Sequence, residues 1–98
     1  MKQPNKVTVG AYDYDIVFVP RLSEDHRLLG QSLCDTQQIK LAENMTEQTK
    51  NEVFWHEVIH AINVVYGCKL SESNTERLAH GITAILKNDF NEVIEWNG

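Results

Sequence analysis

Two histidines and a glutamate near the middle of the chain have the spacing of a zinc-binding motif. His56, Glu57 and His60 form a His-Glu-x-x-His sequence. On a helix, residues four positions apart project from one face, so both imidazoles can reach one tetrahedral ion with Glu57 beside it. Zinc bound in this way lowers the pKa of its water, and the carboxylate can take the proton as that water attacks a carbonyl. The motif predicts metal-assisted hydrolysis with Glu57 as general base.

Chance is a poor explanation for this motif. With the histidine and glutamate content of this chain, roughly 0.014 matches to His-Glu-x-x-His are expected at random. The surrounding residues are mostly apolar, and polar side chains buried there are costly unless they are paired, hydrogen-bonded or bound to a metal. A metal-free structural role for the three residues is the weaker alternative.

A zinc site of this kind needs a third protein ligand. In the elongated motif His-Glu-x-x-His-x-x-Gly-x-x-His, the third ligand is a histidine six residues after the second one. This chain has Asn63 in place of the glycine and Tyr66 in place of that histidine, which excludes this class of site. The third ligand must therefore come from another element.

A carboxylate from the following helix is the preferred third ligand. Glu76 follows His60 by sixteen residues, and on a helical wheel it lies nearer the apolar stripe of its helix than His80 does. Glu72, His80 and Cys68 remain competing candidates. If His80 is not a ligand, it could hydrogen-bond the ligand carboxylate or the reacting oxyanion.

Two long helices are predicted to carry these residues. Thr46 can cap the first helix, which runs to Tyr66, and Gly67 supplies a C-terminal cap. Apolar side chains cover most of its circumference, so this helix should be buried. Ser71 or Ser73 can cap a second, amphipathic helix that continues to about residue 90.

The first part of the chain has the composition of strands. Residues 6–19 are rich in β-branched and aromatic side chains around Gly10 and predict a strand pair or hairpin. Residues 21–27 predict a loop or short helical turn, and residues 32–42 a second extended region. We expect one α+β domain over residues 1–98, with a small antiparallel or mixed sheet packed on two long helices. The strand near Ile39 is expected to be the sheet edge that borders a cleft.

The overall composition restricts the function classes. The 98 residues carry a formal net charge of −5 without a basic patch, so direct binding to nucleic acid is not expected. No stretch is apolar enough to span a membrane, and residues 1–10 do not resemble a signal peptide. We expect a cytoplasmic protein in which Cys34 and Cys68 are reduced thiols. The oligomeric state is not predicted.

These motifs resemble the small His-Glu-x-x-His proteins of phages and mobile elements, which are related to the ImmA/IrrE family of zinc metallopeptidases. The shared pattern is an extended segment around residues 38–42, then W-H-E-V-I-H-A, then a helix that opens with T-E-R-L-A, and it covers about half of the chain. The resemblance implies a minimal zincin-like fold, Zn²⁺ bound by His56, His60 and Glu76, and Glu57 as general base. Its members are thought to act on the repressor of their own element, which implies a peptide or protein substrate of this regulatory type.

Two other functions remain open at this point. A non-catalytic module could use zinc to hold its two helices together while it binds a regulatory protein. In that case Glu76 and His80 would both bind the metal and leave no position for water. A metal-free interaction domain is the third reading, and it requires the His-Glu-x-x-His match to be accidental.

Overall fold

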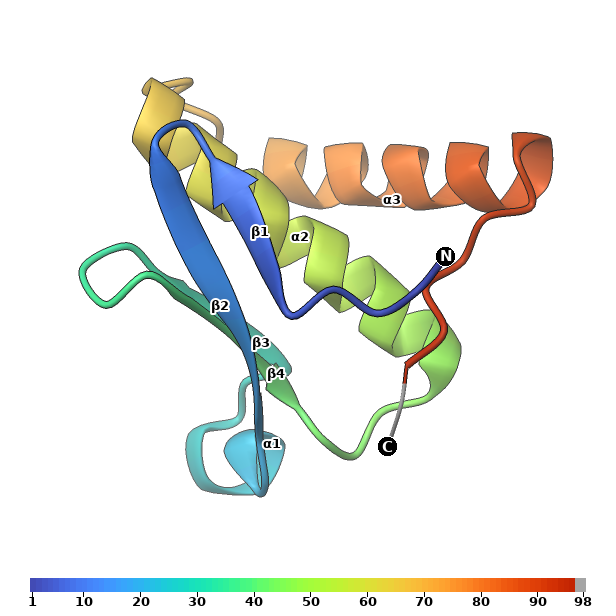
Figure 1. The fold of residues 1–98 in the computed structure, drawn as a ribbon, viewed down its shortest axis with the longest axis horizontal. Coiled ribbons are helices and arrows are strands. Elements are labelled where there is room, and N and C mark those ends of the chain that lie inside the picture. Colours follow the sequence, from blue (N-terminus) through green and yellow to red (C-terminus); the bar gives the residue numbers. More distant parts are fainter. Residues whose placement is uncertain (97–98) are drawn as a thin grey trace.

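Two β-hairpins form one four-stranded mixed sheet (Figure 1). The computed structural model describes residues 1–96, apart from the side chains of residues 25 and 26. β1 (Lys6–Val9) pairs antiparallel with β2 (Tyr12–Val19), and β3 (Gly30–Leu33) pairs antiparallel with β4 (Gln38–Ala42). β2 and β4 lie side by side and parallel, which gives the strand order β1-β2-β4-β3. The predicted α+β class, with a mixed sheet on two long helices, is confirmed.

The first hairpin turns at Gly10, as the sequence predicts. Gly10 has a φ of 60°, a left-handed conformation that glycine adopts without strain. A β-carbon at this position would also lie 2.7 Å from Cγ1 of Val65, near the end of the long helix α2 described below. The turn therefore needs glycine both for its backbone conformation and for its close approach to the helix.

The second extended region differs from the prediction. Residues 32–42 are not one strand, because the chain reverses between β3 and β4, with Gln37 in the left-handed region at a φ of 54°. The turn contains no glycine or proline, and Asp35 and Thr36 alone are a weak turn signal. The expectation that the strand near Ile39 is a sheet edge was wrong. Ile39 lies in the interior strand β4 and is fully buried, whereas β1 and β3 are the edge strands.

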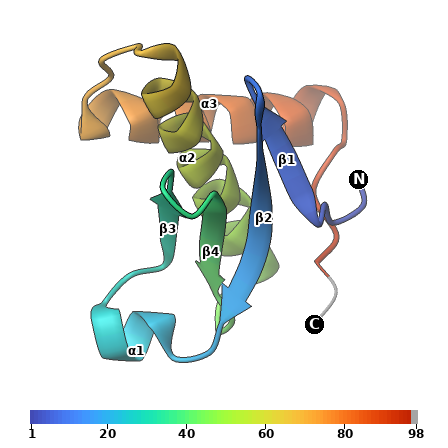
Figure 2. The same cartoon turned by 60° about the vertical axis from the view of Figure 1, so that its left-hand side comes forward.

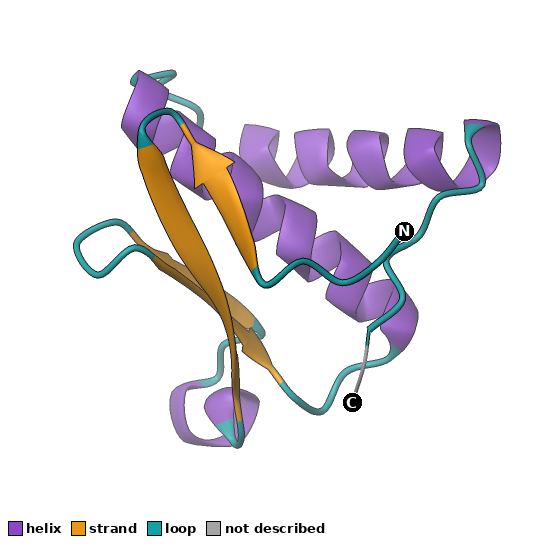
Figure 3. Cartoon of the chain, viewed as in Figure 1, coloured by secondary structure: helices purple, strands orange, loops and turns teal. Residues whose placement is uncertain are grey.

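Two long helices stack on the sheet as successive layers (Figure 2). α2 (Glu47–Tyr66) packs against the sheet, and α3 (Glu72–Asp89) packs against α2. A five-residue helix, α1 (Leu22–His26), joins β2 to β3, where the sequence allowed a short helical turn. Figure 3 shows that the strands lie on one side of α2 and α3 on the other. No helix in the described part of the chain is long and apolar enough to cross a membrane.

The ends of α2 follow the predicted capping residues. The side chain of Thr46 accepts a hydrogen bond from the backbone N–H of Thr49 at 3.2 Å. At the other end Gly67 adopts the left-handed conformation with a φ of 63°, and its N–H donates to the carbonyl of Asn63. These caps fix the helix that carries the motif, and the predicted bounds are confirmed.

The segment after α3 docks on the first half of α2. Asn51 of α2 accepts a hydrogen bond from the N–H of Ile94 at 2.8 Å and donates its amide to the carbonyl of the same residue at 3.3 Å. Trp96 packs edge-to-face on Phe18 and Phe54 in the core. This docking ties the tail to both the sheet and α2, so it stabilises the end of α2 that lies away from the two histidines.

Candidate metal centre

His56 and His60 point their ring nitrogens at one position beside α2. Their Nε2 atoms lie 3.0 Å apart, and the ring centroids are separated by 4.7 Å. The side chains are 21% and 29% exposed, so both are largely surrounded by protein but still reach solvent. Two imidazole nitrogens in this position can act together as ligands of one cation. The convergence follows from their spacing of four residues on a helix.

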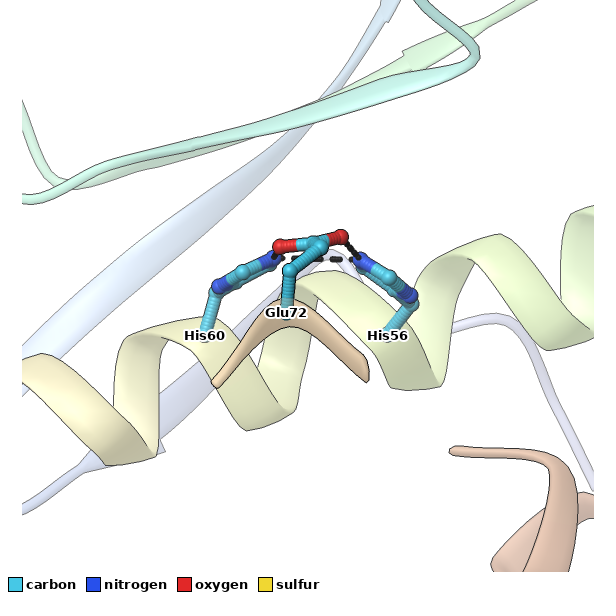
Figure 4. Close-up of side chains that lie close together, drawn as sticks. All are labelled: His56, His60 and Glu72. Atoms are coloured by element: carbon cyan, nitrogen blue, oxygen red, sulfur yellow. Dashed lines mark hydrogen bonds and ion pairs between the residues drawn. The ribbon is translucent and has the colours of Figure 1, made fainter. Parts of the chain in front are cut away.

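A carboxylate from α3 completes the cluster (Figure 4). The two carboxylate oxygens of Glu72 lie 2.8 Å from Nε2 of His56 and 3.0 Å from Nε2 of His60. Each of the three side chains offers one ligand atom, and these atoms all lie within 4.8 Å of one another. Two imidazoles and one carboxylate are a donor set that zinc binds in catalytic sites, so the residues fit this metal.

The position of Glu72 is set by the start of α3. Ser71 is the N-cap, and its side chain accepts a hydrogen bond from the N–H of Asn74 at 3.1 Å, which makes Glu72 the first residue of the helix. The connection is also held from α2. The amide of Asn63 accepts a hydrogen bond from the N–H of Leu70 at 2.9 Å and donates to its carbonyl at 3.3 Å. These bonds fix the start of α3, so that Glu72 lies next to the two histidines.

Glu76, the third ligand favoured from the sequence, does not join this cluster. Its Oε1 lies 3.8 Å from Nε2 of His80, and Nδ1 of His80 lies 3.2 Å from Oε1 of Glu52 on α2. Among the described residues the only group with metal-binding geometry is that of His56, His60 and Glu72. The structure therefore places Glu72, one helical turn earlier, where the sequence analysis placed Glu76. Cys68 is exposed and lies outside the group.

Glu57 is buried between α2 and the edge strand β3. Only 7% of its surface is exposed, and Gly30 lies directly against it. Burial raises the pKa of the Glu57 carboxyl to about 7, the charge of His56 lowers it, and the charge of Glu72 raises it further. A carboxyl group with a pKa near 7 can both accept and return a proton at neutral pH.

Two neighbouring cavities give access to this cluster. One, of about 420 Å³, extends from the cluster between α2 and α3, and the other, of about 350 Å³, extends along β3. Both are lined by His56, Glu57 and Glu72, and Gly30 also lines both. The cluster therefore lies at the junction of two hollows, where a ligand can reach it from solvent.

No protein-family model, curated protein or solved structure matches this chain. Any functional conclusion therefore depends on the chemistry and geometry of these side chains.

Proposed function

We propose that this protein is a zinc-dependent peptidase. The observation that carries the proposal is the convergence of the two Nε2 atoms of His56 and His60 with the carboxylate of Glu72, next to the buried carboxyl of Glu57. Such a centre has three protein ligands, which leaves one position of a tetrahedral zinc site open. When bound, zinc would acidify a water molecule and polarise a peptide carbonyl.

Glu57 is proposed to move the proton. Its carboxyl lines both cavities, where it would first accept a proton from the bound water and then give it to the leaving nitrogen. Gly30 and Val53 pack against this side, where a β-carbon on Gly30 would lie 2.6 Å from Cγ1 of Val53. The packing holds Glu57 beside the cluster and excludes water from its buried side.

β3 is proposed to orient the substrate. It is the sheet edge nearest the cluster, and Gly30 to Ser32 line the cavity that contains His56 and His60. An extended peptide can add to such an edge by main-chain hydrogen bonds, which brings its carbonyl groups past the site. A regulatory protein of the repressor type is the substrate class proposed from the sequence.

A non-catalytic zinc module is less well supported. A site closed by four ligands would need Glu76 and His80, but His80 lies between Glu52 and Glu76, 3.2 Å and 3.8 Å from their carboxylates, and neither residue joins the cluster. We also propose that the protein is cytoplasmic, where the exposed thiols of Cys34 and Cys68 would stay reduced.

The test is hydrolysis of a defined peptide library, followed by mass spectrometry. Wild-type protein with zinc should cleave library members, and chelation of the zinc should stop the cleavage. Glu57→Gln should bind zinc as wild type does but lower the cleavage rate at least about 100-fold, because general-base catalysis typically contributes that much. Cleavage at an undiminished rate by Glu57→Gln would remove Glu57 as the base. Absence of cleavage by zinc-loaded wild type would contradict the peptidase function.

A further inference from the structure

α3 forms the outermost layer of the fold, and one of its sides is apolar and open to solvent (Figure 3). It packs against α2, and its buried residues Thr75 and Ala79 mark the side that is covered. Leu78 and Ile85 lie about 60–120° farther round the helix from these two residues. Their side chains are 46% and 52% exposed, so this second side of α3 presents large apolar groups to solvent.

The open side of α3 carries an uncharged strip along almost its whole length. At 100° per residue, the residues of this strip fall within an arc of about 120°. We call them the α3 strip, and they are Asn74, Leu78, Gly81, Ile82, Ile85 and Asn88. Apart from Ile82, they follow one another in alternating steps of four and three residues. This is the spacing at which one helix pairs with another along a seam.

Gly81, in the middle of the strip, is not explained by packing within one chain. A β-carbon at this position would have no atom within 4 Å, so no close contact inside the described chain requires glycine. In a helix interior, glycine is less favourable than alanine by roughly 1 kcal/mol. Glycine on an open helix face does allow a second backbone to approach closely. Gly81 therefore indicates a helix from outside the chain packed against this point.

The α3 strip is complementary to itself when two copies pair antiparallel. Leu78 and Ile85 are equally far along the chain from the point between Gly81 and Ile82. A twofold axis through that point sets Leu78 of each copy opposite Ile85 of the other. It also sets Gly81 opposite Ile82, so the larger side chain fills the space that the glycine leaves open.

The charges beside the strip favour the same antiparallel arrangement. Arg77 and Asp89 are exposed, and neither forms an ion pair with a described residue. In the antiparallel pair, Arg77 lies three residues, or about 4.5 Å along the axis, from Asp89 of the second copy, within reach of an arginine side chain. A parallel pair would instead set Arg77 beside Arg77 and Asp89 beside Asp89, and like charges repel.

We infer that a second copy of this chain covers the α3 strip, and that two chains form a twofold-symmetric dimer through an antiparallel pair of α3 helices. Glu72 and Glu76 lie on the opposite side of α3, where they line the larger cavity, so the dimer leaves the metal cluster open. The inference does not depend on the peptidase function. One helix pair is a small interface, so the dimer should dissociate at micromolar or higher concentrations.

The test is sedimentation equilibrium of the full chain from about 1 to 500 µM, the range in which so small an interface should dissociate. Chelator and reductant are present, so neither a shared metal ion nor a disulfide can link two chains. Wild type should pass from monomer to dimer within this range. Ile85→Asp should raise the dissociation constant at least about 100-fold, because the dimer would bury an unpaired carboxylate.

Tyr12→Asp is the matched control for Ile85→Asp. Tyr12 is 50% exposed, much like Ile85, but it lies on β2 and not on α3. This variant should dimerise as wild type does, and circular dichroism should show that both variants keep their helices. A wild type that is monomeric at every concentration would overturn the inference and leave the α3 strip for a different protein. Equal weakening of the dimer in both variants would overturn it as well.

A charge reversal tests the antiparallel arrangement itself. Arg77→Asp and Asp89→Arg should each raise the dissociation constant at least about threefold, because each sets like charges beside one another in the dimer. The double variant restores opposite charges and should return the dissociation constant to near the wild-type value. A double variant that dimerises no better than the two single variants would overturn the antiparallel pairing.

Discussion

Gly30 lies directly against the carboxyl group of Glu57. A β-carbon on Gly30 would be 3.0 Å from Cγ and 3.2 Å from Oε2 of Glu57, and 2.6 Å from Cγ1 of Val53. The edge strand thus approaches the motif helix so closely that only glycine fits. This contact couples the position of the proposed base to the strand that would hold the substrate.

Gly30→Ala should therefore impair hydrolysis more than zinc binding. The added methyl group must displace Val53 or Glu57, which should lower the free energy of unfolding by about 1–3 kcal/mol. His56 and His60, the proposed ligands, are not among the nearest atoms that the methyl group would meet, so zinc affinity should change little. Activity, zinc affinity and urea unfolding measured on one preparation would separate these effects.

Gly81→Ala provides the control for that experiment. Gly81 lies in α3, and a β-carbon there would have no atom within 4 Å. Alanine in a helix interior is favoured over glycine by roughly 0.5–1 kcal/mol, so this variant should be as stable as wild type or more stable. Full activity in Gly30→Ala, or equal loss in both variants, would contradict a specific contact between Gly30 and Glu57.

The raised pKa of Glu57 predicts a pH-dependent stability of the metal-free protein. The pKa rises from 4.5 to about 7 on folding. Below pH 4.5 the carboxyl is protonated in both the folded and the unfolded protein, and it does not lower the free energy of unfolding. Above pH 7 it is ionised in both, and burial of its charge lowers the free energy of unfolding by the full amount. Stability from this group is thus lost as the pH rises from about 4.5 to 7.

Glu57→Gln should remove this dependence. In the presence of chelator, the variant should gain about 1–3 kcal/mol in free energy of unfolding relative to wild type between pH 4.5 and pH 8. Urea denaturation of both proteins over this range gives the difference directly, and contributions from other titrating groups cancel in it. Parallel pH profiles for the two proteins would show that Glu57 has an ordinary pKa.

Asn63 is predicted to affect zinc binding although it does not belong to the metal-binding group. Its amide makes both hydrogen bonds that hold Leu70, immediately before the N-cap of α3. Asn63→Ala should cost about 1–2 kcal/mol in stability and weaken zinc binding by roughly 10-fold or more, because Glu72 loses its fixed position. Asn88→Ala, on the exposed part of α3, is the matched control and should retain wild-type zinc affinity. Unchanged zinc affinity in Asn63→Ala would contradict this role.

The sequence predicts those parts of the fold that depend on local signals. Thr46 and Gly67 bound α2 as expected, and Gly10 marks the first hairpin. The second hairpin was not predicted, because the left-handed residue in its turn is Gln37 and not a glycine. Strand order also depends on which apolar faces meet in the core, and the local pattern around Ile39 does not contain that information.

Glu72, and not Glu76, lies next to His56 and His60 in the structure, and the criterion applied to the sequence also favours Glu72. The helical wheel ranked Glu76 above His80 by its distance from the apolar stripe. At 100° per residue, Glu72 lies about 40° closer to that stripe than Glu76 does. Choosing Ser71 over Ser73 as the cap would also have placed Glu72 in the first turn, where the chain returns to α2. The missing information was the exact start of the helix.

The most direct test of the proposed site is the zinc content of wild type, Glu72→Ala and Glu76→Ala, measured by elemental analysis after equilibration at the same buffered free zinc concentration. The two variants remove the same group one turn apart on α3. The proposed site predicts about one zinc per chain in wild type and in Glu76→Ala, and a loss of most of it in Glu72→Ala. Zinc retained in Glu72→Ala but lost in Glu76→Ala would make Glu76 the ligand, and no zinc in wild type would contradict the metal centre itself.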